Sequence, residues 1–512
     1  MRYLLGIDFG TGGTKVCLTD GELNQLAYSF REYPIYTDQP DWSEHSPALY
    51  YSATCENIRA CLAQSGVSPK EIAAIAVSAA MPSLVLTDAA GGAIGRAINL
   101  MDRRAKEEVA FVGQTVGMQR YFDVTANRLE DHPAIVNLLW LKRNMPEVYC
   151  RAHAIHSIDG YLTYRLTRVH NVNVSNAMFF GAYDIYNRRF DESMLLQLGL
   201  DPNMFPPVTG CEEIIGTLTP EAAANTGLIP GIPVLSGQTD CNAGWLGGGA
   251  IAPGDIQMNL GTCGNFGIIT SEPDFVDSMI NFDYTVAGTY ITVPTTLTGG
   301  VLLRYLRDQF SQLELATQSL TGVDAYDLLN REAEPISPGS DGLIVLPYLM
   351  GERTPIWDAD AKGTIFGLSL RHTKGHIVRA MMESVAYALY HSFETLSPHI
   401  HNINTPLVLN EGGAKSVLWR RIITDVFNLP TVLVKNRAGA PYGDCLLAAK
   451  GAGLIKDYSI SRERTEYIDR MDPDPRTHEL YMEYFALYKQ LYLQLKDQFK
   501  MLSALNRKYG GK

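Results

Sequence analysis

A short glycine–threonine pattern occurs twice in this 512-residue chain, about half a chain apart. It reads "DFGTGGT" at residues 8–14 and "NLGTCGN" at residues 259–265, and both times G-T-x-G follows an apolar, strand-like run. Self-similarity at such a distance is typical of a repeated structural unit. The sequence therefore predicts two similar domains with facing glycine loops. The boundary is expected in the glycine-rich stretch 247–255, which gives domains of 1–248 and 249–512.

Short strand-like runs alternate with longer helical stretches along the chain. Segments such as "YLLGID", "AAIAVS" and "PLVLN" are typical of buried strands, and "SPALYYSATCENIRACLA" and "HIVRAMMESVAYALYHSFETL" are typical of helices. This alternation predicts an α/β fold. Because two more strand-like segments follow "YLLGID" around a "TDGELN" turn, the chain is expected to open with a three-strand meander. The aromatic stripe of the last helix is interpreted as core packing; it comprises Tyr481, Tyr484, Phe485, Tyr488 and Tyr492.

The charge balance limits the partners that this chain can bind. Its 43 basic and 55 acidic residues give a formal net charge of −12, which disfavours nucleic acids and anionic membranes. No apolar run of roughly 18 residues exists, and "MRYLLGIDFG" turns polar too soon for a signal peptide, so no membrane partner is expected. The eight cysteines show no CxxC spacing and are expected to be reduced thiols of a cytoplasmic protein. Any anionic ligand must then be held locally, by loops and helix ends.

The stretch "GIDFGTGGTK" (6–15) puts an aspartate directly before a glycine loop. It matches neither the GxxxxGK[ST] phosphate loop nor the GxGxxG dinucleotide fingerprint. Backbone N–H groups and the hydroxyls of Thr11 and Thr14 can hold phosphates, while Asp8 holds Mg²⁺ through water. The alternative is an aspartate-capped hairpin turn whose glycines supply positive φ angles. This stretch alone leaves both interpretations open.

Three further glycine turns favour a nucleotide ligand. The loop at 259–265 repeats the first one, and Gly299 and Gly300 precede a helix whose N-terminus suits an anion. Gly412 and Gly413 join a strand to the next helix. A single Gly-Gly pair is weak support, but four such turns in one acidic chain indicate a nucleotide-binding protein.

Two aspartates outside the glycine loops are candidates for catalysis and for sugar binding. In "SGQTDCNAG", Asp240 lies at a strand-to-helix junction, where it is either a general base for a substrate hydroxyl or a helix N-cap, and the spacing alone favours the cap. In "INLMDRRA", Asp102 can accept hydrogen bonds from sugar hydroxyls, and Arg104 can orient a sugar or a carboxylate. The alternative is a helix-start aspartate followed by solvated arginines.

Several stretches together resemble the FGGY family of carbohydrate kinases, within the larger actin/hexokinase/Hsp70-type ATPase fold. "GTIFGLSLRHTKGHIVRAMMESV" (363–385) is similar to the family's second signature, and "LPYLMGERTPIWD" (346–358) to its Y-L-x-G-E-R-x-P run. Further similar segments follow in the family's order; they are "DFGTGGTK", "QPDWSEHSP", "SGQTDCNAG", "NLGTCGNFG" and "NEGGAKSVLWRRIITDV". The resemblance covers nearly the whole chain and is greatest toward gluconate, xylulose and autoinducer-2 kinases.

The resemblance implies two RNase H-like domains that close over ATP, Mg²⁺ and a small sugar, sugar acid or polyol in the cleft between them. Asp240 corresponds to the base that deprotonates the acceptor hydroxyl, and Asp8 to the residue that positions the metal. The implied nucleotide-binding residues are Thr11, Gly12, Gly13, Thr14, Lys15, Gly261, Thr262, Gly299, Gly300, Arg304, Gly412, Gly413 and Ala414. The implied substrate-binding residues are Met81, Pro82, Asp102, Arg104 and His132, together with Asp240. Dimers are common among such kinases, so a homodimer is a further expectation.

Three positions depart from the family pattern. Pro82 stands where gluconate and xylulose kinases carry histidine, Cys241 stands where many members have Asn or Gln, and Asn137 replaces the usual lysine of the first signature. Because proline donates no hydrogen bond, the substrate is left open among sugars, sugar acids and polyols. Two rival interpretations also stay open: a catalytically altered family member that senses a sugar, and an actin- or Hsp70-like ATPase switch.

Overall fold

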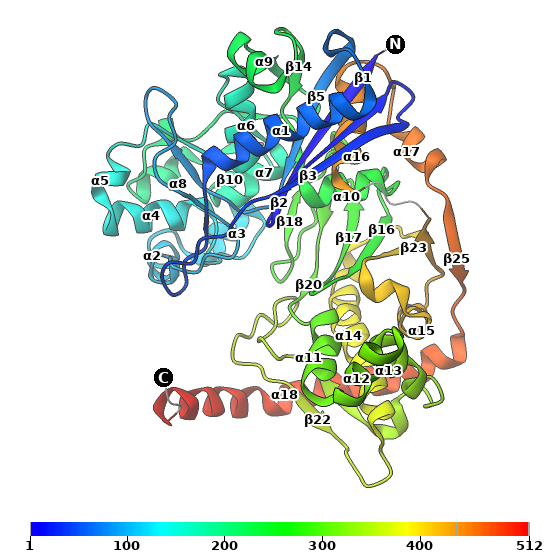
Figure 1. The fold of residues 1–512 in the computed structure, drawn as a ribbon. Coiled ribbons are helices and arrows are strands. Elements are labelled where there is room, and N and C mark those ends of the chain that lie inside the picture. Colours follow the sequence, from blue (N-terminus) through cyan, green and yellow to red (C-terminus); the bar gives the residue numbers. More distant parts are fainter. Residues whose placement is uncertain (1, 436–438, 510–512) are drawn as a thin grey trace.

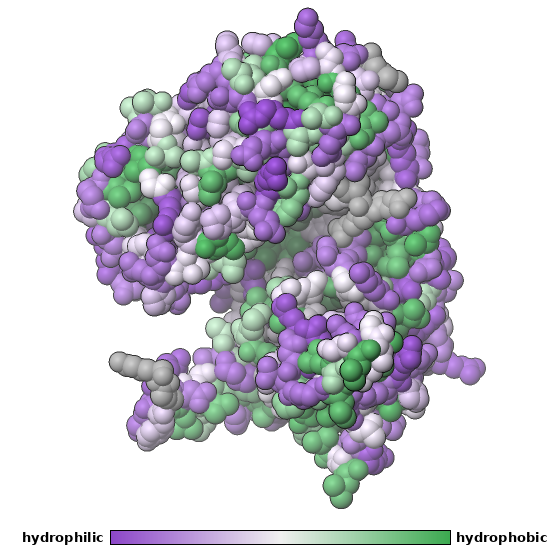
Figure 2. All heavy atoms as spheres, in the orientation of Figure 1, coloured by the Kyte–Doolittle hydropathy of each residue, from purple (hydrophilic) through white to green (hydrophobic). Residues whose placement is uncertain are grey.

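The computed structural model describes residues 2–435 and 439–509 of the chain. Two lobes, each built on its own β-sheet, lie one above the other (Figure 1). The N-terminal half supplies the first sheet and the C-terminal half supplies the second. In the space-filling view, a hollow separates the lobes on the left side of the molecule (Figure 2).

The first sheet opens with the predicted meander. β1 (Tyr3–Gly10), β2 (Gly13–Asp20) and β3 (Gln25–Glu32) pair antiparallel in chain order, and the "TDGELN" turn joins the last two. β1 also pairs in parallel with β5 (Ile72–Ala79). Three short strands complete the sheet beyond β5; they are β14 (Pro233–Leu235), β13 (Ile214–Thr217) and β15 (Gln238–Thr239).

The second sheet repeats this topology. β16 (Asp255–Leu260) and β17 (Gly264–Thr270) form an antiparallel hairpin, and β16 pairs in parallel with β23 (Asn404–Asn410), as β1 does with β5. The other strands are β18 (Asn281–Asp283), β19 (Tyr290–Thr292), β20 (Thr295–Thr296), β24 (Thr431–Val434) and β25 (Tyr467–Met471). Both repeats of the glycine–threonine pattern thus contain the turn of an equivalent hairpin. The predicted α/β fold of two RNase H-like domains is confirmed.

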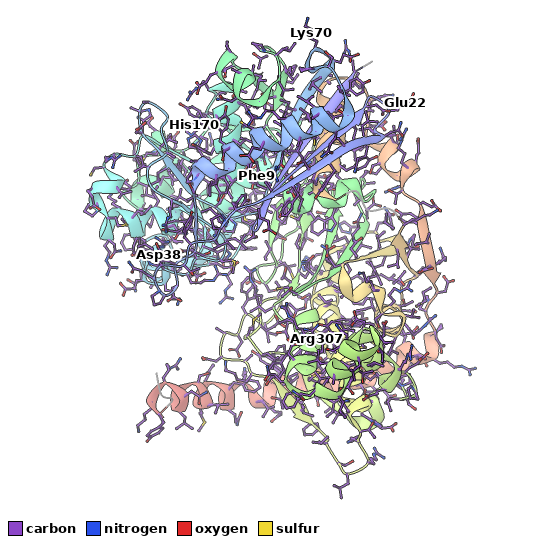
Figure 3. All side chains as sticks on the ribbon, in the orientation of Figure 1. Phe9, Glu22, Asp38, Lys70, His170 and Arg307 are labelled. Carbon is purple, nitrogen blue, oxygen red and sulfur yellow. The ribbon has the colours of Figure 1, made fainter. Side chains whose placement is uncertain are left out.

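Side-chain alternation along β1 gives the first sheet two different faces. Its odd-numbered apolar residues face α1 (Pro47–Ser65) and α6 (Ile158–Thr167); they are Leu5, Ile7 and Phe9. Figure 3 labels Phe9 on this strand. Leu4 packs on the opposite face, against α16 (Ala440–Gly451). Because Asp8 is also even-numbered, its carboxylate lies on the face that α16 covers.

α16 and α10 (Asp240–Gly247) lie between the two sheets. They approach so closely that a Cβ on Gly443 of α16 would lie 1.9 Å from the backbone oxygen of Ala243 in α10. α16 also touches β1, since a Cβ on Gly6 would lie 1.9 Å from the Pro441 oxygen. The chain therefore returns to the first lobe after building the second sheet. A division after residue 248 separates the two sheets, but α16 packs with the first of them.

The apolar core of the second lobe gathers helices from the later part of the chain. These are α11 (Gly300–Phe310), α13 (Ala325–Ala333), α14 (Lys374–Leu396), α15 (Val417–Phe427) and α18 (Pro475–Tyr509). The aromatic stripe of α18 is core packing as predicted, with Tyr481, Phe485 and Tyr488 buried. In the described part of the chain, no helix is both long and apolar enough to cross a membrane.

Candidate functional site

The first glycine loop is the tight turn between β1 and β2. Tyr33 braces it: its hydroxyl donates to the Gly10 oxygen at 2.5 Å, and its backbone N–H donates to the Gly12 oxygen at 3.3 Å. A Cβ on Gly13 would lie 2.4 Å from the Arg31 oxygen, so only glycine fits there. A Cβ on Gly12 would meet no described atom within 4 Å, so the turn is open on that side.

Asp8 lies near the end of β1, on the face toward α16. Its carboxylate accepts hydrogen bonds from Lys15 Nζ at 3.0 Å and from Ser78 Oγ at 3.2 Å. Burial raises the pKa of Asp8, and this effect outweighs the opposing influence of Lys15 and Ser78. The alternative of a turn-capping aspartate is not supported, because both of these partners are side chains outside the turn. Thr11 lies in the turn itself, and Thr14 is buried at the start of β2.

Asp444 of α16 lies beside Asp8, and sequence reasoning missed it. Ser78 Oγ is 2.7 Å from Asp444 Oδ2, and Gln238 Nε2 donates to Asp444 Oδ1 at 2.9 Å. Burial, followed by the charge of Asp8, raises the pKa of Asp444 well above its ordinary value. The one signal in the sequence is a single carboxylate inside the apolar stretch "PYGDCLLAA". These contacts join the second half of the chain to the end of β5 in the first sheet.

Asp240 is the first residue of α10, but it is not the helix cap. Thr239 caps α10, because its side chain accepts from the Asn242 N–H at 3.3 Å. The N-cap interpretation of Asp240 is therefore wrong. The Asp240 carboxylate is partly buried and accepts from the Cys241 N–H at 2.7 Å. Burial, and then the charge of Asp8, raises the pKa of Asp240 to about 7.

A cavity of about 460 Å³ opens in the second lobe beside the other glycine turns. The predicted nucleotide-binding residues that line it are Gly261, Thr262, Gly300, Arg304, Gly412 and Gly413. Gly299 and Ala414 are next to these residues in the chain but do not line the cavity. Its apolar walls, which sequence reasoning missed, are formed by Leu260, Val301, Leu303, Tyr326, Leu329, Met382 and Trp419. Apolar walls with glycine backbone between them suit a nucleoside.

The predicted substrate residues Met81 and Pro82 lie close to Asp240 through strand pairing. Ala79, the last residue of β5, pairs with Thr239 of β15. Met81 and Pro82 follow the end of β5, and Asp240 follows the end of β15. Two predicted parts of the site are thus placed at neighbouring strand ends by the sheet itself.

Asp102 and Arg104 bind each other. The Asp102 carboxylate is fully buried and accepts from the Ser43 N–H at 2.7 Å and from Arg104 Nη2 at 2.6 Å. The Arg104 guanidinium lies 3.9 Å from the ring centre of Trp42, and its side chain is 2% exposed. The alternative of solvated arginines after a helix-start aspartate is wrong for Arg104. Direct contact of Asp102 or Arg104 with a sugar stays a prediction.

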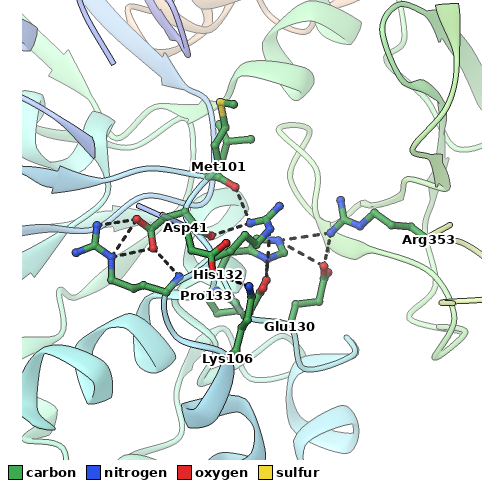
Figure 4. Close-up of polar contacts among 12 residues, drawn as sticks. Asp41, Met101, Lys106, Glu130, His132, Pro133 and Arg353 are labelled. Atoms are coloured by element: carbon green, nitrogen blue, oxygen red, sulfur yellow. Dashed lines mark hydrogen bonds and ion pairs between the residues drawn. The ribbon is translucent and has the colours of Figure 1, made fainter. Parts of the chain in front are cut away.

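A charged cluster spans the cleft near the last predicted substrate residue, His132. Arg353 of the second lobe forms an ion pair with Glu130 and lies 3.4 Å from His132 Nε2 (Figure 4). His132 Nδ1 also lies 3.1 Å from Asp131 Oδ1. We call Arg103, Glu130, Asp131, His132 and Arg353 the cleft cluster. Sequence reasoning did not identify Arg353, although it lies in the "GERTP" segment.

The donor set suits a magnesium–nucleotide complex. Among the described residues, no group of three or more His, Cys, Asp and Glu side chains is placed to hold a metal ion. Mg²⁺ usually keeps several waters and is bound by one or two carboxylates together with substrate phosphates. Asp8 meets that requirement, because it lies beside the first glycine loop and interacts electrostatically with Asp240.

Replacing Asp444 by alanine is expected to destabilise the protein by about 1–3 kcal/mol, because Gln238 Nε2 loses its buried acceptor and Ser78 keeps only its longer contact with Asp8. Asparagine can donate to Ser78 and accept from Gln238, so Asp444→Asn is expected to cost less than about 1 kcal/mol. Denaturant unfolding of both variants checks this. Equal losses in the two variants would contradict the hydrogen-bonding role.

Comparison with known proteins agrees with this geometry. Residues 3–247 match the model of the N-terminal domain of the FGGY family of carbohydrate kinases, and residues 257–452 match that of the C-terminal domain. A xylulose kinase of Bacillus subtilis is 28% identical, and the match covers 97% of this chain and 98% of the xylulose kinase. A gluconokinase of Bacillus licheniformis is 26% identical, and the match covers 100% of this chain and 99% of the gluconokinase. The crystal structure of xylulose kinase from Rhodospirillum rubrum superposes with a TM-score of 0.90 at 26% identity, covering 98% of this chain and 100% of that one. The chain belongs to the FGGY family of carbohydrate kinases.

Proposed function

We propose that the protein transfers the γ-phosphoryl group of ATP to a hydroxyl of a small sugar, sugar acid or polyol, with Asp240 as the general base. The position of Asp240 carries this proposal. It follows β15 beside the end of β5, and it is close enough to Asp8 for their charges to interact. A carboxylate for the proton, a carboxylate for the metal and two glycine loops for phosphates are the parts that phosphoryl transfer requires.

The remaining residues bind and orient the reactants. The cavity in the second lobe holds the adenosine, and the turns at Gly12 and Gly261 hold the phosphates through their backbone N–H groups. Lys15 adds a positive charge next to Asp8. Bound Mg²⁺ offsets the negative charge of the phosphates. Asp240 then accepts the proton of the substrate hydroxyl as its oxygen attacks.

A coupled assay of ADP release over ketoses, alditols and aldonates tests this function. We expect release that depends on both an acceptor and Mg²⁺. Release at the same rate without any acceptor would favour the ATPase switch instead. Binding of a sugar without any ADP release would favour the sensor.

The raised pKa of Asp240 predicts a rate that depends on pH. A base works only when ionised, and kcat/KM reports the ionisations of the free enzyme. With a pKa of about 7, the ionised fraction of Asp240 falls as pH drops below that value. We therefore expect kcat/KM to rise about tenfold per pH unit up to roughly pH 7 and then to level off. A rate profile that stays flat across this range would contradict the assignment.

We further propose domains of 1–248 and 249–512, with α16 packed on the first. The two family models end and begin close to this boundary, at 247 and 257. A cytoplasmic location agrees with the eight free cysteines, none of which forms a disulfide in the described chain. A homodimer stays a prediction from the resemblance.

A further inference from the structure

Resting on the proposed function, we infer that the acceptor is an uncharged ketose or alditol and not a sugar acid, because the cations at the sugar end of the cleft are already held by carboxylates. A protein that selects a carboxylate substrate usually offers it a guanidinium whose charge is not already offset by the protein's own carboxylates. The three arginines around the predicted sugar site therefore decide the matter.

The charge of Arg104 is already offset by two carboxylates of the protein, and its side chain is only 2% exposed. Its Nε lies 2.9 Å from Asp102 Oδ1, and its Nη2 lies 2.8 Å from Glu44 Oε1. The guanidinium also packs against the rings of Trp42 and Trp140, at 3.9 and 5.1 Å from the ring centres. A substrate carboxylate would have to break a buried ion pair to reach it, which is costly.

Arg103 is more exposed but is also engaged. Its Nη1 donates to the backbone oxygens of Leu100 and Asp102 at 2.9 Å, and its Nε lies 3.7 Å from Asp131 Oδ1. Asp131 in turn holds His132 at 3.1 Å. One carboxylate therefore offsets the charge of Arg103 and satisfies the histidine.

Arg353 brings the third guanidinium from the second lobe, and Glu130 of the first lobe holds it across the cleft (Figure 4). Its charge also reaches Cys263, where it opposes the burial that raises the pKa of the thiol. Arg353 thus lies between the sugar end and the second glycine loop. The neighbouring Arg128 is not part of this end, because it lines a separate cavity with Phe275.

The balance of charge points the same way. In this network of charges, the cations are outnumbered by the carboxylates. The cations are Lys15, Arg96, Arg103, Arg104 and Arg353, and the carboxylates are Asp8, Asp38, Glu44, Asp102, Glu130, Asp131 and Asp240. A second anion next to the phosphates would meet net repulsion here. Hydroxyl groups, by contrast, hydrogen-bond to carboxylates without adding charge.

Matched acceptors test the inference in the coupled ADP assay: xylitol against xylonate, glucitol against gluconate, and D-xylulose as the ketose. We expect kcat/KM for the best uncharged acceptor to exceed that of the best acid at least tenfold. A preference for the acids would overturn this inference and leave the kinase proposal standing. No acceptor-dependent ADP release from any compound would overturn both.

Freeing Arg103 provides the second test. Asp131→Asn removes the carboxylate shared by Arg103 and His132, and it should raise the acid-to-alditol ratio of kcat/KM by up to about fivefold, the usual worth of a partly exposed ion pair. Asp41→Asn is the matched control, since Asp41 pairs with Lys106 at 2.8 Å outside the cleft cluster. An unchanged ratio in Asp131→Asn, or an equal rise in the control, would overturn the inference.

Discussion

Replacing Asp240 by asparagine is expected to lower kcat by about 10²–10⁴-fold, the usual contribution of a positioned general base. Nucleotide and sugar affinity should stay near those of the wild type, because only the proton acceptor is lost. The local structure should survive, since the Thr239 cap is untouched and the asparagine oxygen can still accept from the Cys241 N–H. Initial rates and nucleotide titration of the variant measure the two effects separately.

Asp283 offers a control for this prediction. It is another buried aspartate whose pKa burial raises, in this case to about 6, but it binds Tyr183 at 2.8 Å and Arg188 at 2.9 Å. Asp283→Asn should therefore change the melting temperature more than it changes kcat. Wild-type turnover in Asp240→Asn, or a comparable loss of kcat in Asp283→Asn, would contradict the role given to Asp240.

The repeated elements of the fold could be predicted because their signals are local. An apolar strand followed by a glycine turn reads the same way in both halves, and both turns proved to be equivalent hairpins. The sequence favours Asp240 as the cap of α10, one residue after the actual cap Thr239, because the two residues are adjacent and both are good capping residues. Local statistics alone do not separate two such neighbours.

The contacts that the sequence did not reveal are those between distant segments. Ser78 and Asp444 are 366 positions apart, and Glu130 and Arg353 are 223 positions apart. Asp444 stands out only as a single carboxylate in an apolar stretch, which does not name its partner, and the other three look like ordinary polar residues in their own segments. Ser78 and Asp444 meet because α16 returns to the first sheet. Glu130 and Arg353 meet because the two lobes face each other across the cleft.

Replacing Gly412 by leucine is expected to raise the KM for ATP at least about tenfold without destabilising the fold. A Cβ at this position meets no described atom within 4 Å, yet the residue lines the cavity assigned to the nucleoside. A bulky side chain there would occupy space that the ligand needs. The loss should appear in nucleotide binding, measured by calorimetry, as well as in the KM.

Gly413→Ala is the contrasting variant, because steric crowding there comes from the protein itself. Its Cβ would lie 2.7 Å from Leu260 Cβ and 3.0 Å from the Trp419 ring. Overpacking of this kind costs about 1–3 kcal/mol, so this variant should unfold at a lower denaturant concentration than the wild type. The two adjacent glycines thus separate occlusion from destabilisation. If Gly412→Leu binds ATP as tightly as the wild type does, the nucleoside does not occupy this cavity. The loops at Gly12 and Gly261 would then not bind the phosphates of a nucleotide held there.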